Sequence, residues 1–94
     1  MEQEVVDNTT LHRFELRLDG KVAGFAQYRL EPGRVVLTHT EVDDAFEGHG
    51  LGSKLAGATL DTLRERGGLK VVPQCPFVAK YIEHHPQYAD LVTP

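Results

Sequence analysis

Glu47-Gly48-His49-Gly50-Leu51-Gly52-Ser53 is the stretch that decides the fold, because the spacing of apolar residues changes on either side of it. Before this stretch, apolar and polar residues alternate as they do in β-strands. After it, apolar residues recur at helical spacing until Gly67-Gly68, a typical helix end. The sequence therefore predicts a turn from a strand into a helix that runs from about Gly50 to Arg66.

Upstream of this turn, the sequence predicts three antiparallel strands. Residues 14–18 alternate in polarity, and Asp19-Gly20 is typical of a two-residue hairpin turn. A second strand covers about residues 21–30, and Glu31-Pro32-Gly33 turns the chain into a third strand, residues 34–42. These strands form an antiparallel meander.

Downstream of the helix, residues 69–72 form a short strand that Pro73 ends. A strand, a helix and a returning strand make a crossover, so we expect the last two strands to be parallel, with a right-handed connection. A short helix at about residues 77–84 follows Pro76, and residues 87–94 are irregular or form one helical turn. The expected fold class is α/β (α+β), in the order β-β-β-α-β-α, as a single domain of residues 1–94 with its core at about residues 12–92.

The length, net charge and composition of the chain limit the partners and the cell compartment that we expect for it. The chain has 94 residues, and its net charge of −4 argues against nucleic acid or an anionic membrane surface as the main partner. Cys75 is the only cysteine, and the sequence contains neither a signal-peptide pattern nor an apolar run long enough to span a membrane. We therefore expect a cytoplasmic protein.

The glycines of the central stretch indicate an anion site. Three glycines at alternate positions leave backbone N–H groups unobstructed, and the start of a helix adds partial positive charge, a combination suited to a phosphate or pyrophosphate. Gly52-Ser53-Lys54 inverts the order that a P-loop requires, and a dinucleotide-binding fingerprint would need glycine in place of Ser53. The alternative is a glycine-rich linker that only turns the chain tightly into the helix.

Four motifs in order carry a resemblance to a known family. They are Thr38-His39-Thr40-Glu41-Val42, then Gly48-x-Gly50-Leu51-Gly52-Ser53-x-Leu55, then Lys70-Val71-Val72-Pro73-x-Cys75-Pro76-Phe77-Val78, and finally His85-Pro86-x-Tyr88-x-Asp90-Leu91-Val92. Together they span nearly the whole chain. The sequence resembles the small YjdJ-type branch of the GCN5-related N-acetyltransferase (GNAT) superfamily and, through it, a minimal form of that fold.

The resemblance implies acetyl-CoA as cofactor and an amine, of unidentified kind, as acceptor. It implies that backbone amides from Glu47, Gly48, His49, Gly50, Leu51 and Gly52, with Ser53, bind the CoA pyrophosphate. The pantetheine arm would lie along Thr40-Glu41-Val42, where the last two strands splay apart. A backbone N–H near Thr40 would hold the oxyanion while the amine attacks the thioester directly, and no metal is needed.

Four side chains are candidates for the chemistry. Cys75 follows the last strand, where its thiol could accept the acyl group or polarise the site, or could be a small buried hydrophobe. His39 and Glu41 lie two residues apart on one strand and share a face, as a base with its orienting partner or as a solvent-facing polar pair. Tyr81 lies where larger relatives carry a general acid, although such a tyrosine is also typical of packing. The alternative function is a CoA-binding or protein-interaction module with little catalytic power.

Overall fold

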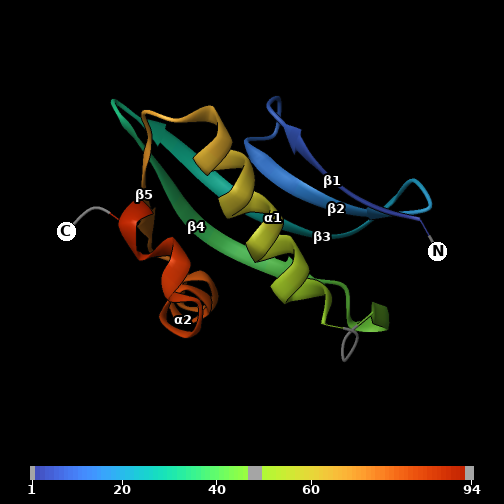
Figure 1. The fold of residues 1–94 in the computed structure, drawn as a ribbon. Helices are drawn as coiled ribbons and strands as arrows, with labels where there is room; N and C mark the ends of the chain where they lie inside the picture. Colours follow the sequence, from blue (N-terminus) through green and yellow to red (C-terminus); the bar gives the residue numbers. More distant parts are fainter. Residues whose placement is uncertain (1, 47–49, 93–94) are drawn as a thin grey trace.

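Five strands form one sheet, and their order in the sheet is their order in the chain. The computed structural model describes residues 2–46 and 50–92. Figure 1 shows the sheet with its two α-helices. The elements are β1 (Gln3–Asn8), β2 (Arg13–Leu18), β3 (Lys21–Glu31), β4 (Arg34–Val42), the 3₁₀ turn η1 (Asp44–Phe46), α1 (Leu51–Arg66), β5 (Lys70–Pro73), α2 (Pro76–His84) and the 3₁₀ turn η2 (Pro86–Leu91).

The predicted meander and crossover are confirmed. Strands β2, β3 and β4 pair antiparallel, and β5 pairs parallel to β4. The sheet also has a first strand that the sequence analysis did not predict, because β1 pairs antiparallel with β2 and extends the sheet to Gln3. The helix boundaries agree with the prediction at the end of α1, and α2 begins one residue earlier, at Pro76.

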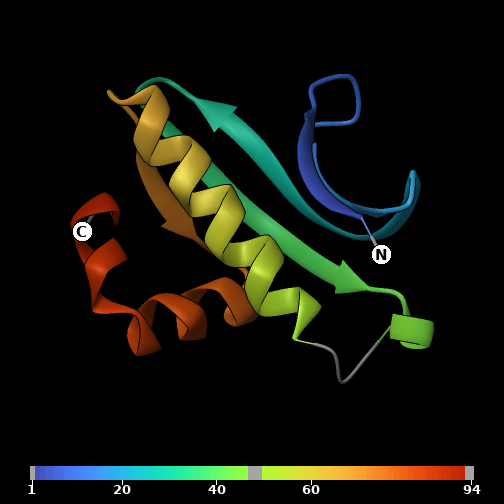
Figure 2. The ribbon, with the colours of Figure 1, turned by 45° about the vertical axis from the view of Figure 1, so that its right-hand side comes forward.

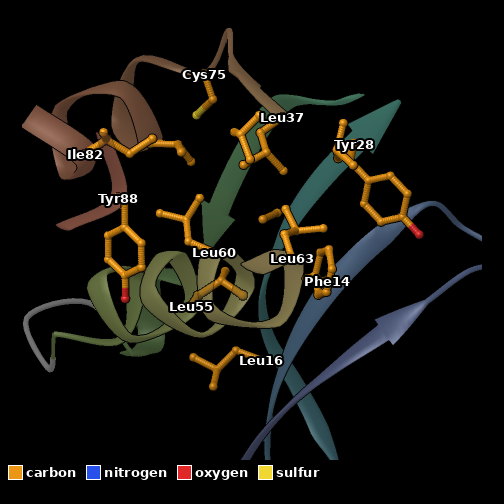
Figure 3. Close-up of a cluster of buried hydrophobic side chains, with 14 of the residues drawn as sticks. Phe14, Leu16, Tyr28, Leu37, Leu55, Leu60, Leu63, Cys75, Ile82 and Tyr88 are labelled. Atoms are coloured by element: carbon orange, nitrogen blue, oxygen red, sulfur yellow. The ribbon is translucent and has the colours of Figure 1, made fainter. Parts of the chain in front are cut away.

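One face of the sheet packs against α1, which crosses it diagonally in Figure 2. The apolar side of α1 contributes Leu55, Leu60 and Leu63, each at most 1% exposed. Each such leucine stabilises the fold by about 1.5–3 kcal/mol relative to an exposed one. Figure 3 shows these leucines packed with side chains of the sheet, and Cys75 belongs to the same cluster.

A β-bulge divides β4 into two parts that present different groups to their neighbours. Gln27 lies opposite His39 and Tyr28 lies opposite Leu37, so Thr38 is the extra residue. The Leu37 carbonyl accepts a hydrogen bond from the Cys75 amide, on the β5 side of β4, whereas the Asp43 amide donates to Ala23, on the β3 side. Before the bulge, odd-numbered residues such as Leu37 direct their backbone groups toward β5. After the bulge, odd-numbered residues such as Asp43 face β3, so the even-numbered residues direct their backbone groups toward the β5 side.

Strands β4 and β5 separate after a short ladder. Their pairing runs from Arg34 opposite Lys70 to Leu37 opposite Pro73, while β4 continues to Val42. Figure 2 shows β4 extending well beyond the end of β5. The second half of β4 therefore lies beyond the parallel ladder with β5, as the sequence analysis expected.

Candidate functional site

A cleft of about 340 Å³ lies between the end of β4 and the start of α1. Six residues predicted to bind the cofactor line it together: Thr40, Val42, Gly50, Leu51, Gly52 and Ser53. The other three predicted residues, Glu47, Gly48 and His49, lie outside the described residues. The described part of the chain thus brings the strand motif and the glycine motif to one cavity.

The first turn of α1 forms one wall of the cleft. Gly50 caps the helix with a φ of 70°, in the left-handed region that favours glycine, and no side chain caps the helix. The Lys54 amide makes the first intrahelical bond, to the Gly50 carbonyl, at 3.2 Å. The amides of Leu51, Gly52 and Ser53 precede it and have no carbonyl within the helix to bond, so this helix start can bind an anion.

The opposite wall is the free part of β4. Thr40 lies opposite Ala26 and Val42 opposite Gly24, so their side chains share the sheet face on which α1 packs. Because the Asp43 amide bonds toward β3, the alternation of an antiparallel ladder directs the backbone groups of Thr40 and Val42 away from β3. The cleft is therefore bordered by strand N–H and C=O groups that can pair with an extended, amide-containing ligand.

Cys75 contacts Thr40, a residue of this wall, from the side of the hydrophobic core. Its thiol donates a hydrogen bond to the Thr40 hydroxyl oxygen, with 3.4 Å between Sγ and Oγ1. The side chain is 4% exposed and packs in the core cluster, so it is a buried hydrophobe and also a polar neighbour of the cleft. Since the Thr40 oxygen accepts from Cys75, the Thr40 hydroxyl hydrogen remains free to donate elsewhere.

Two aromatic residues of the cleft were missed by the sequence analysis. Phe46 and Phe77 line it together with the predicted residues. The Phe77 ring lies so close to Gly52 that a β-carbon there would come within 2.9 Å of the ring. A larger residue at position 52 would therefore have to displace the Phe77 ring. The position of Phe77 directly after Pro76, at the start of a helix, was the available signal.

A second cavity, of about 660 Å³, adjoins the cleft across Thr40 and Val42, which line both. Its other residues combine three carboxylates with an aromatic ring: Glu41, Asp43, Asp44 and Phe25, with Arg13, Val22, Ala23 and Gly24. Asp43 Oδ1 accepts the Ala45 amide at 2.9 Å, which orders the turn into η1. We call this the acidic cavity. Its lining suits an aliphatic cation.

His39 and Glu41 lie together, as predicted, but on the sheet face opposite α1. They pair with Gln27 and Phe25, on the other face from Thr40, and Nε2 of His39 lies 3.2 Å from a Glu41 carboxylate oxygen. Both are well exposed, at 54% and 64%. Only Glu41 lines the acidic cavity. Of this pair, the Glu41 carboxylate is therefore the group that a ligand in that cavity would meet.

Tyr81 is not brought together with Cys75 and Thr40. A β-carbon on Gly57, in α1, would come within 2.7 Å of the Tyr81 hydroxyl, so this group points at the middle of α1. Burial and the nearby charge of Asp61 raise the pKa of Tyr81, and a hydrogen bond with Tyr88 opposes the rise. Its ring stacks on His85, with 3.9 Å between ring centroids. Tyr81 lines a different cavity, of about 270 Å³.

Two further properties concern the described residues only. Within residues 2–46 and 50–92, no group of three His, Cys, Asp or Glu side chains is arranged to hold a metal ion. None of the helices in these ranges is long and apolar enough to cross a membrane.

Sequence comparisons match the chain to known proteins over most of its length. A family model described as GCN5-related N-acetyl-transferase matches residues 13–91. Protein NATD1 of Mus musculus is 36% identical over 86 residues, which cover 87% of this chain and 77% of that protein. Protein NATD1 of Homo sapiens has the same identity over the same length and is covered to 75%.

Solved structures match the fold. The NMR solution structure of a GCN5-like protein from Staphylococcus aureus aligns with a TM-score of 0.71 and 25% identity, over 96% of this chain and 87% of that one. The crystal structure of the ribosomal-protein-S18-alanine N-acetyltransferase from Escherichia coli aligns with a TM-score of 0.56 and 26% identity, over 76% of this chain and 43% of that one. These matches confirm the predicted fold class. The narrower YjdJ-type assignment stays a prediction.

Proposed function

Because the chain belongs to the family of GCN5-related N-acetyltransferases, we propose that it binds acetyl-CoA in the cleft between β4 and α1 and transfers the acetyl group to an amine in the acidic cavity. The observation that carries this proposal is the shared wall of the two cavities. Thr40 and Val42 line both, so a donor on one side and an acceptor on the other would meet at the free part of β4.

The residues of the cleft fit the parts of CoA. The N–H groups at the start of α1 suit the pyrophosphate, and the free backbone edge at Thr40 and Val42 suits the amides of the pantetheine arm. Glu47, Gly48 and His49 remain part of the proposed pyrophosphate loop on the strength of the family resemblance alone. In this proposal the nine residues predicted from the sequence form one binding site.

Bound acetyl-CoA would supply a thioester: the acceptor nitrogen would form a C–N bond to the acetyl carbon and the C–S bond would break. The proton that the nitrogen gives up on forming the amide would go to the CoA sulfur, so that CoA leaves as its thiol. The Thr40 amide N–H would stabilise the carbonyl oxygen as it gains negative charge. The free hydroxyl hydrogen of Thr40 would donate into the same cleft, toward the leaving sulfur. Cys75 is then a positioning residue, because its hydrogen bond to Oγ1 orients that hydroxyl.

Glu41 would accept the proton that the acceptor ammonium must lose before it can attack. It lines the acidic cavity, and His39 Nε2, 3.2 Å away, can pass the proton on to solvent. Asp43 and Asp44 would attract a cationic acceptor to the cavity. The general acid predicted at Tyr81 receives no support from its position against α1, so we assign Tyr81 no step of the transfer.

The alternative function, a CoA-binding or protein-interaction module, is supported by the exposure of the His39–Glu41 pair to solvent, at 54% and 64%. A free-thiol assay with acetyl-CoA and a panel of aliphatic amines separates the two. Release of CoA that depends on the amine, with an equal amount of acetylated amine found by mass spectrometry, supports the enzyme. Binding of CoA without amine-dependent release favours the module.

A further inference from the structure

Strand β1 forms one edge of the sheet, and its outer side is open within residues 2–46 and 50–92. The strand order places β1 at the end of the sheet opposite β5, as Figure 1 shows, and its ladder joins it to β2. An edge strand exposes N–H and C=O groups that another strand can bond, and natural edges are commonly blocked by proline, lysine or a bulge. Gln3–Asn8 contains neither proline nor lysine, and its register with β2 has no shift. This edge is therefore free to pair with a further strand.

A hydrogen bond at the start of the ladder fixes which residues of β1 face outward. The Asp19 amide donates to the Glu2 carbonyl at 2.9 Å, so Glu2 and Asp19 form a hydrogen-bonded pair. In an antiparallel ladder such pairs alternate with pairs whose backbone groups point away from the partner strand. The residues of β1 that direct their N–H and C=O groups away from β2 are therefore Gln3, Val5 and Asp7.

These three residues are self-complementary about Val5. When two copies of β1 pair antiparallel with the two Val5 residues opposite each other, Gln3 of each copy lies opposite Asp7 of the other. Every outward N–H and C=O group of the three residues then meets a partner. A register centred on Val6 would instead place Gln3 opposite Thr9, beyond the end of the strand. The backbone therefore favours the register centred on Val5.

The apolar and charged side chains fit the same register. Val5 lies opposite Leu16, on the face that α1 covers, and packs partly buried against the core. The two Val5 side chains would extend this apolar contact across the interface. On the other face, Glu4 of each copy would lie opposite Val6 of the second. No carboxylate of the strand faces another directly, so like charges do not oppose the pairing.

The amide side chain of Gln3 supplies a polar contact on the face that α1 covers. It would lie opposite the Asp7 carboxylate of the second copy. This carboxylate accepts hydrogen bonds from the Tyr28 hydroxyl at 2.6 Å and from Arg66 at 2.8 Å, which fix it at the edge of the sheet. Its two oxygens have further lone pairs, so they can also accept from the Gln3 amide.

We propose that the protein associates with a second copy of itself through β1, so that two five-stranded sheets join into one. The two-fold axis passes through the Val5 pair, perpendicular to the sheet, and leaves both α1 helices on the same face. A ladder of six residues is smaller than a standard interface, so the dimer dissociates on dilution. No residue of β1 lines the cleft or the acidic cavity, and the inference does not depend on the proposed function.

Sedimentation equilibrium tests the association. The average mass of the wild type should rise from that of the monomer toward twice that value between about 1 μM and about 1 mM, the range of weak dissociation constants. Val5→Pro removes an outward N–H and leaves the bonds to β2 in place, so it should stay monomeric. Val5→Thr keeps the N–H and the branched shape and should associate as the wild type does. A monomeric wild type at every concentration, or a folded Val5→Pro variant that still associates, would overturn the proposal.

Cysteine cross-linking tests the register without changing the backbone. In Val5→Cys the two Cα atoms would lie about 5.5 Å apart, within reach of a disulfide, so mild oxidation should give a covalent dimer. In Val6→Cys the two positions lie diagonally, about 7–8 Å apart, and should give none. The native Cys75 is only 4% exposed and serves as an internal control. A covalent dimer from Val5→Cys alone supports the proposed pairing, and any other result overturns it.

Discussion

The thiol of Cys75 lies 3.4 Å from the hydroxyl oxygen of Thr40, so a side chain that follows β5 contacts the wall that β4 contributes to the cleft. This contact forms just where the two strands have separated. The Leu37 carbonyl accepts the Cys75 amide at the end of the ladder, and three residues later Thr40 faces the cleft. Cys75 is thus positioned by its backbone and its side chain together.

Replacement of Cys75 tests its role as a positioning residue. Cys75→Ala should lower kcat about tenfold with little change in KM, because Thr40 loses the hydrogen bond that orients its hydroxyl. Cys75→Ser keeps a donor at this position and should restore most of the rate. Steady-state kinetics with acetyl-CoA and a diamine measure both.

An acetyl-cysteine intermediate is the alternative role for this thiol. Direct attack by the amine predicts that mass spectrometry of the protein, quenched during turnover, finds no acetyl group on Cys75. A burst of acetylated protein in the wild type, absent from Cys75→Ser, would show that Cys75 carries the acetyl group itself.

Glu41 is expected to act on the acceptor side. Glu41→Gln keeps the size of the side chain and should lower kcat/KM for a diamine by at least a factor of about 10², since the base is lost. The loss should shrink at high pH, where more of the acceptor is already a free amine. Glu4→Gln, on the exposed edge strand β1, is the matched control and should leave the rate unchanged. Equal rates for both variants would exclude Glu41 as the base.

The left-handed backbone of Gly50 offers a separate test of the cleft. Alanine at Gly50 should cost about 1–2 kcal/mol of stability, because its φ is positive, and should also weaken CoA binding by shifting the first turn of α1. Gly67, at the other end of α1, has a φ of 69° against 70° for Gly50. Its ψ of 165°, against 15° at Gly50, lies in a region that essentially only glycine adopts, so Gly67→Ala should lower the melting temperature at least as much and leave CoA affinity intact. Unchanged CoA affinity in Gly50→Ala would remove this helix start from the binding site.

Glu15 provides a prediction about stability and pH. This carboxylate is only 2% exposed, and it accepts hydrogen bonds from Arg13, Arg17 and Asn8. Burial opposes its ionisation, but the arginines and Asn8 outweigh burial, so the pKa of Glu15 is lowered from its ordinary value of 4.5. The stabilisation is therefore complete above that value and is lost as the pH falls through the lower pKa of the folded state.

Glu15→Gln should accordingly reduce the free energy of unfolding by about 1–3 kcal/mol at pH 7. The gap between variant and wild type should close as the pH falls below the ordinary carboxyl value, because both side chains are then neutral. Urea denaturation at pH 7 and at pH 3 measures the two gaps. A gap that stays constant between these values would mean that the charge of Glu15 contributes nothing.

The fold was predictable from periodicity, apart from its first strand. Val5 and Val6 are adjacent apolar residues, and they do not alternate with polar ones, so β1 carries no clear strand pattern. The strand forms because all of its residues, Gln3–Asn8, pair antiparallel with residues of β2. A local signal was present in Asn8, whose side-chain oxygen accepts the Leu11 amide and closes the turn between β1 and β2.

The candidate site was predictable where it depends on backbone position, and less so where it depends on side-chain direction. Thr40 and Val42 join the glycines in one cleft, as the motif order indicated. The bulge at Thr38 could not be foreseen, and it determines which face His39 and Glu41 occupy. The direction of Tyr81 follows from Gly57, two residues past Leu55 in α1, which leaves space for its hydroxyl. Contacts between residues that are far apart in the sequence do not change the local spacing of apolar and polar residues, so the sequence pattern does not reveal them.

Amide NMR of the ¹⁵N-labelled protein, titrated with acetyl-CoA, tests most directly whether the cleft between β4 and α1 binds this donor. The account predicts saturable shifts that are largest for the amides of Thr40, Val42, Gly50, Leu51, Gly52 and Ser53, with smaller shifts on β1, at the far edge of the sheet. Absence of binding at millimolar acetyl-CoA, or shifts centred away from these amides, would contradict it.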